Sequence, residues 1–104
     1  MLDMITTDDK IICKFTGRMD AVASMRCEND VEIRIQQAKK PVVFDLELVD
    51  YVSSAFIRLC IAAIKKSGAE NFSIINACEP VRKVFNISGL ENFLKAAPAP
   101  GQLQ

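Results

Sequence analysis

The stretch VVFDLELVDYVSSAFIRLC, residues 42–60, decides the fold. It opens with Val42-Val43-Phe44, an apolar run without alternation, which is typical of a strand covered on both faces. From residue 56 to residue 64 the apolar side chains form one wide helical face, and Ser67-Gly68 is expected to end that helix. A second apolar run at residues 72–75 follows. The sequence therefore predicts a strand–helix–strand unit with parallel strands and a right-handed crossover.

Before this unit, two short segments alternate with a period of two, at residues 2–5 and 11–16. The polar run Thr6-Thr7-Asp8-Asp9 between them predicts a turn, so the two segments are expected to pair as an antiparallel hairpin that ends at Gly17. A helix is expected next, capped by Asp20 or Ser24. Its apolar positions recur at spacings of four, four and three, and form one stripe: Cys27, Val31, Ile35 and Ala38.

The C-terminal part of the chain predicts one more helix, which begins at Pro80 and stops at Gly89, followed by a short helical turn. The order of elements indicates an α/β sandwich: a mixed sheet of about four strands with three to four helices packed on it. We expect one domain over residues 1–95. The last nine residues, 96–104, carry no pattern and are expected to form a mobile tail.

Composition excludes several functions. The chain has 104 residues, 13 basic and 13 acidic side chains, and no histidine. Without histidine there is no Ser-His or Cys-His couple and no imidazole metal ligand. A net charge of zero gives no general attraction for nucleic acid or anionic membranes, and no apolar run is long enough to span a bilayer. The four cysteines lack a C-x-x-C pair, so we expect buried, reduced thiols in a cytoplasmic protein: Cys13, Cys27, Cys60 and Cys78.

The first candidate site is the turn that carries Ser53 and Ser54, between the central strand and its helix. In parallel sheets, functional groups gather beyond the carboxyl ends of the strands, where helix N-termini present free amides. Serine is also a preferred helix cap, so a purely structural role stays open for this pair.

Two weaker candidates remain. Asp45, Glu47 and Asp50 could hold a divalent cation or act as phospho-acceptors, but a hard cation needs several converging oxygens, so we expect solvated loop carboxylates and no metal site. Cysteine chemistry is also disfavoured. Each thiol lies in an apolar pattern, and the acidic neighbour of Cys78 is expected to lower the reactivity of that thiol.

Three segments in register resemble the STAS domains, and within them the anti-sigma factor antagonists of bacterial partner-switching modules. Gly17-Arg18-Met19-Asp20 is similar to the end of the family's second strand. VVFDLELVDYVSSAFIRL, residues 42–59, is similar to its central strand, phosphorylation loop and following helix. Residues 81–85 with Ile87-Ser88-Gly89-Leu90 are similar to its last helix and the stop that follows it.

The resemblance implies that Ser54 is the phosphorylated residue, with Ser53 as the second choice. Ala55 agrees with one variant of the family loop, whereas Phe56 stands where a glycine is usual. The resemblance also implies a partner-binding patch around the acceptor: Asp20, Asp50, Ser53, Ser54, Ala55, Phe56 and Arg58. Each of Asp20, Phe56 and Arg58 also has a structural alternative, as helix cap, core residue and solvated side chain respectively.

The function implied is that of a non-enzymatic anti-sigma factor antagonist without cofactors. Its partner would be an anti-sigma factor that is also a serine kinase of the histidine-kinase-like ATPase fold, bound when Ser54 is unmodified and released when it is phosphorylated. A serine phosphatase would reset it. A second possibility, kept open by Phe56, is a STAS subunit docked permanently on an ATPase or transporter of a membrane transport complex. An enzyme that uses Ser54 as its nucleophile ranks last, because no base is evident beside Ser54.

Overall fold

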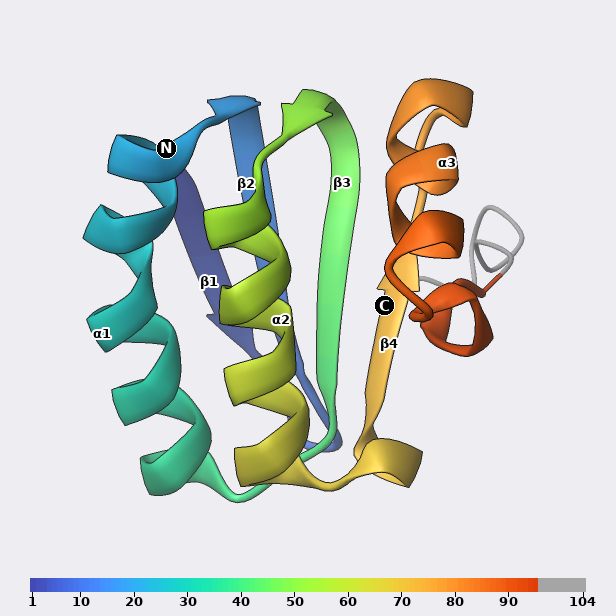
Figure 1. Ribbon diagram of the computed structural model, residues 1–104. Helices are drawn as coiled ribbons and strands as arrows, with labels where there is room; N and C mark the ends of the chain where they lie inside the picture. Colours follow the sequence, from blue (N-terminus) through green and yellow to red (C-terminus); the bar gives the residue numbers. More distant parts are fainter. Residues whose placement is uncertain (96–104) are drawn as a thin grey trace.

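A computed structural model describes residues 1–95 of the chain; the tail expected over residues 96–104 lies outside the described residues. A four-stranded sheet has the order β1-β2-β3-β4, with β1 antiparallel to β2 and the other neighbours parallel. This confirms the mixed α/β sheet (Figure 1). The strands are β1 Leu2–Thr6, β2 Ile11–Met19, β3 Val42–Val52 and β4 Phe72–Ile75, and the helices are α1 Ala21–Ala38, α2 Ser54–Ser67, α3 Glu79–Ile87 and the 3-10 turns η1 Ala69–Asn71 and η2 Glu91–Phe93.

Two strands run further than the sequence pattern indicated. Gly17 does not end the hairpin: β2 passes through it to Met19, and Gly17 adopts φ +93° next to a register shift against β3. Glycine enters that conformation without the steric cost that other residues meet. The central strand likewise continues past Phe44 to Val52, because Leu46 and Val52 keep entering the core. Both strands therefore end at the same edge of the sheet, where α1 and α2 begin.

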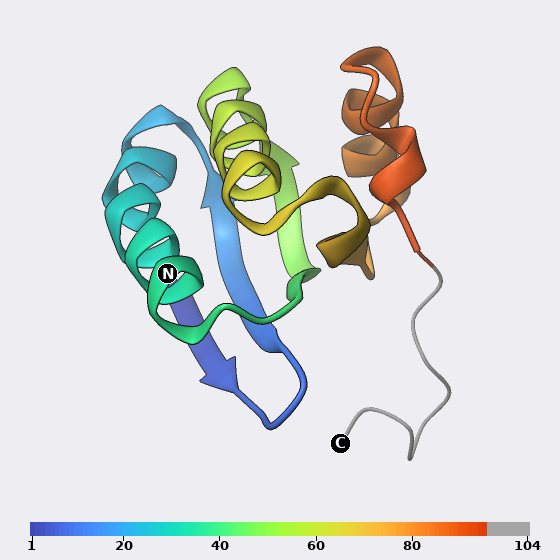
Figure 2. The same cartoon turned by 90° about the horizontal axis from the view of Figure 1, so that it is seen from below.

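The helices α1 and α2 lie side by side on one face of the sheet (Figures 1 and 2). Asp20 caps α1, and its carboxylate accepts a hydrogen bond from the Ala23 N–H at 2.9 Å. The expected apolar stripe of α1 is buried at Cys27, Val31 and Ile35. The third helix, α3, packs at the β4 end of the sheet.

Phenylalanine side chains fill the centre of the core between the sheet and α2. The Phe15 and Phe44 ring centroids lie 4.9 Å apart, and Phe72 meets Phe44 at the same distance, both edge to face. Such contacts add about 0.5–1.5 kcal/mol per pair to the free energy gained by burial. The rigid core fixes where β3 ends and α2 begins, and so fixes the turn between them.

Candidate functional site

The turn between β3 and α2 gives its two serines different environments. Ser53 is half-buried and caps α2, since its side-chain oxygen accepts a hydrogen bond from the Phe56 N–H at 3.3 Å. The Ser53 N–H donates to the carbonyl oxygen of Met19 at 2.9 Å and ties the turn to the end of β2. Ser54 is the first residue of α2 and is exposed, and within residues 1–95 its hydroxyl makes no hydrogen bond. The capping role therefore falls to Ser53 and leaves the Ser54 hydroxyl accessible.

Three charged residues of the expected patch lie around this turn. Asp20 is half-buried and directly follows Met19, the residue that Ser53 binds, so Asp20 stands beside the turn while it caps α1. Asp50 is exposed at a β-bulge: Val49 and Tyr51 each face a residue of β2, whereas Asp50 faces none. Arg58 is exposed on α2, one helical turn beyond Ser54.

Ala55 and Phe56, which were also expected in the contact patch, are not on the surface. Ala55 is 6% exposed and Phe56 is not exposed at all. Position 56 falls on the side of α2 that faces the sheet, and its ring joins the aromatic core at 5.0 Å from Phe15. A partner protein therefore cannot contact the Phe56 ring, and the ring does not narrow access to Ser54. Phe56 is therefore a core residue and not part of the contact patch.

The structure adds surface residues that the sequence pattern did not single out. Arg18 stacks on Tyr51, with its guanidinium carbon 3.9 Å from the ring centroid, on neighbouring positions of β2 and β3. Val22 and Met25, in the first turns of α1, are 58% and 68% exposed. The Arg18–Tyr51 pair depends on a bulged register that sequence does not specify. Val22 and Met25 could have been found as apolar residues outside the stripe of α1.

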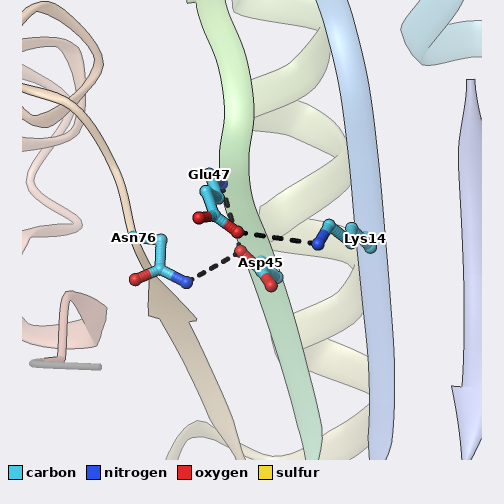
Figure 3. Close-up of polar contacts among 4 residues, drawn as sticks. All are labelled: Lys14, Asp45, Glu47 and Asn76. Atoms are coloured by element: carbon cyan, nitrogen blue, oxygen red, sulfur yellow. Dashed lines mark hydrogen bonds and ion pairs between the residues drawn. The ribbon is translucent and has the colours of Figure 1, made fainter. Parts of the chain in front are cut away.

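Among residues 1–95, the three carboxylates of the acidic set do not gather into a cluster that could hold a metal ion. Asp45 lies on β3 with an exposure of only 8%, so the expectation of a solvated loop carboxylate is wrong for this residue. Its Oδ1 accepts hydrogen bonds from Asn76 Nδ2 at 3.0 Å and from the Glu47 N–H at 3.1 Å (Figure 3). Glu47 pairs with Lys14 at 3.6 Å. These side chains lie on the sheet face turned away from α2, and residues 1–95 hold no cluster of three candidate metal ligands.

Three of the four thiols are buried, and one is not. Burial raises the pKa of Cys13 to about 12 and raises that of Cys60 well above its ordinary value. Cys78 is exposed, so the expectation that all four are buried is wrong there. It precedes α3 at the edge of the sheet, where its thiol contacts the carbonyl oxygen of Val49 at 3.6 Å.

Comparison with known proteins places the chain in a family. The family model of the STAS domain matches residues 1–102. The chain belongs to the STAS domain family. Among curated relatives, this STAS domain is 27% identical over 99 residues to BtrV of Bordetella bronchiseptica, a protein named as an anti-sigma factor antagonist; the match covers 92% of this chain and 84% of BtrV.

Solved structures share the fold of this STAS domain. The anti-sigma factor antagonist SpoIIAA in its unphosphorylated form superposes with a TM-score of 0.83 at 19% identity, covering 99% of this chain and 93% of SpoIIAA. The phosphorylated form of Bacillus SpoIIAA gives 0.75 at 18% identity, with 99% and 96% of the two chains covered. An anti-sigma factor antagonist from Mycobacterium paratuberculosis gives 0.80 at 21% identity, with 98% and 88% covered. Among residues 1–95, none of the helices combines the length and the hydropathy that a membrane span requires.

Proposed function

We propose that this STAS domain is an anti-sigma factor antagonist switched by phosphorylation of Ser54. The observation that carries the proposal is that the two serines of the β3–α2 turn have different environments. Ser53 caps the helix, whereas Ser54 presents an exposed hydroxyl with no hydrogen bond inside the described chain. Membership of the STAS family and the likeness to BtrV, an anti-sigma factor antagonist by name, support the assignment.

The partner proposed is an anti-sigma factor that is also a serine kinase of the histidine-kinase-like ATPase fold, with a serine phosphatase to reverse the modification. The unmodified domain binds this kinase in the cytoplasm, and the phosphorylated domain releases it. The contact surface combines Ser54, Asp20, Asp50 and Arg58 with exposed apolar residues of α1, Val22 and Met25. The domain itself is regulatory and not catalytic, because the chain has no histidine that could activate Ser54 as a nucleophile.

Electrostatics predicts that phosphorylation of Ser54 weakens partner binding without unfolding the domain. A phosphate adds about −1.5 to −2 charges. At the first residue of α2 the helix dipole favours negative charge by about 0.3–2 kcal/mol, so the fold tolerates it. Opposite an acidic group of the partner at about 4 Å, each unit of charge costs up to about 4 kcal/mol at an effective dielectric constant near 20. The complex therefore dissociates while the domain stays folded.

The alternative of a permanently docked transport subunit drew its support from Phe56 in place of a glycine. That ring is buried and leaves Ser54 exposed, so the departure no longer argues against phosphorylation.

The proposal is tested by incubating the purified domain with its cognate kinase and ATP and mapping the phosphate by mass spectrometry. We expect one phosphate, on Ser54, none on Ser54→Ala, and continued phosphorylation of Ser53→Ala. Phosphate that persists in Ser54→Ala, or a wild-type domain left unmodified by a kinase that binds it, would overturn the proposal.

A further inference from the structure

We propose that Arg58 is the intramolecular partner of the phosphate on Ser54 and holds it along the exposed side of α2. The inference rests on the proposed phosphorylation of Ser54 and adds the residue that receives the phosphate. It concerns how the phosphorylated form is held, which is separate from what that form does to the partner.

Helix geometry brings the two side chains together. Ser54 and Arg58 are both in α2, four residues apart, and side chains at this spacing lie on one helix face with Cβ atoms about 5–6 Å apart. Both are exposed, whereas the three residues between them, Ala55, Phe56 and Ile57, are buried against the core. Ser54 and Arg58 are therefore the side chains that the first turns of α2 present to solvent on that face.

The guanidinium of Arg58 has no competing partner among residues 1–95 and is available to bind a phosphate. Within residues 1–95 its guanidinium takes part in no ion pair and no hydrogen bond to another side chain. The cations that do form ion pairs lie elsewhere: Lys14 with Glu47, Lys66 with Glu32, and Lys83 with Glu79. Arg18, near the end of β2, is stacked on Tyr51.

The chemistry of the pair suits a phosphate. A guanidinium can donate two parallel N–H bonds to two phosphate oxygens, a geometry that a lysine ammonium lacks. An acidic group that precedes a basic one by four residues is also the favoured orientation on a helix. Pairing cancels about one of the charges that phosphorylation adds, so the phosphorylated surface keeps about one net negative charge at this point. An aspartate at position 54 carries only one negative charge, and pairing with Arg58 would leave about no net charge there. We therefore expect Ser54→Asp to imitate the phosphate poorly.

The test uses the full chain with phosphoserine installed at position 54 during translation, so no kinase is needed. Phosphorus NMR follows the second ionisation of the phosphate in the wild-type background and in the Arg58→Gln and Arg58→Lys variants. Arg82→Gln, an exposed arginine on α3, is the matched control. Asp20 and Asp50 are present in every variant, so their effect on the phosphate cancels in the comparison.

We expect the phosphate of the wild-type background to ionise at a pH lower by at least about 0.3 than in Arg58→Gln. Arg58→Lys should restore part of the difference, and Arg82→Gln should behave like wild type. Equal titrations in the wild-type and Arg58→Gln backgrounds would overturn the inference. Binding of the same samples to the kinase is measured separately: release without pairing refutes only the role of Arg58, and pairing without release refutes only the switch.

Discussion

The Phe56 ring meets the Phe15 ring edge to face, with centroids 5.0 Å apart and an interplanar angle of 89°. Phe44 lies 6.0 Å from Phe56 on the strand beneath it. The residue two places after the proposed acceptor thus anchors the start of α2 to the sheet. Because the Phe56 ring points into the core, it leaves the hydroxyl of Ser54, two residues earlier, exposed on the surface.

Phe56→Ala is expected to lower the free energy of unfolding by about 3–5 kcal/mol, the usual cost of removing a buried phenylalanine side chain. Urea denaturation followed by circular dichroism measures the change. Ile61→Ala, on the same helix but 37% exposed, serves as the control and should cost far less. Equal losses for the two variants would show that Phe56 is not the anchor described above.

The two serines of the turn are expected to differ in stability. Ser53→Ala removes the side-chain acceptor of the Phe56 N–H and should cost about 1 kcal/mol, whereas Ser54→Ala should leave the free energy of unfolding nearly unchanged. The same denaturation experiment checks both. A larger loss at Ser54 than at Ser53 would mean that the capping role is assigned to the wrong residue.

Asp45→Ala is expected to cost about 1–3 kcal/mol, because it leaves the amide of Asn76 without its acceptor in a part-buried site and removes the acceptor of the Glu47 N–H. Glu47→Ala is the control. Its ion pair with Lys14 is largely exposed at the carboxylate, and such pairs contribute at most about 1 kcal/mol. Thermal unfolding of the two variants gives the comparison, and a harmless Asp45→Ala would contradict it.

Thiol reactivity should single out Cys78. At pH 8 an aromatic disulfide reagent is expected to label one of the four thiols rapidly in the native chain and the remainder only after denaturation. Rapid labelling of a Cys78→Ser variant would contradict the burial of the others.

Stability should also fall at alkaline pH. The folded chain keeps the proton of Cys13 up to a pKa of about 12, whereas an unfolded thiol ionises near 9.0. Above pH 9 the unfolded state therefore binds fewer protons than the folded state, and the stabilisation is lost as pH rises from about 9 towards 12. Urea midpoints between pH 8 and pH 11 measure this loss, which should be smaller in Cys13→Ala relative to the same variant at pH 8.

Most of the fold follows from local patterns. The apolar run at Val42 predicted the parallel strand–helix–strand unit, and the apolar stripe of residues 27–38 predicted α1. Asp20 was one of two residues expected to cap α1, and a cap on α2 was expected from the pair Ser53-Ser54 without a choice between them. Strand ends were less predictable. β3 runs to Val52 through a bulge at Asp50, and a bulge breaks the period of two on which strand prediction depends.

The sequence placed Ser54 in the turn where the structure exposes it, and anticipated the surface around it only in part. The apolar spacing of residues 56–64 already placed Phe56 on the helical face expected to be buried, but its position two residues after Ser54 also allowed a partner contact, so both roles stayed open. With Ser54 as the first residue of α2, Phe56 turns to the sheet and Arg58 to solvent. Asp45 escaped prediction as a buried group because its partner, Asn76, lies 31 residues away in the chain.

The most direct test of the switch is the affinity of the cognate kinase for the domain with serine or phosphoserine at position 54, measured by isothermal titration calorimetry at one ionic strength. We expect phosphoserine to weaken binding by about 100- to 1,000-fold while the melting temperature stays the same or rises slightly. Equal affinities for the two forms, with both domains folded, would contradict it.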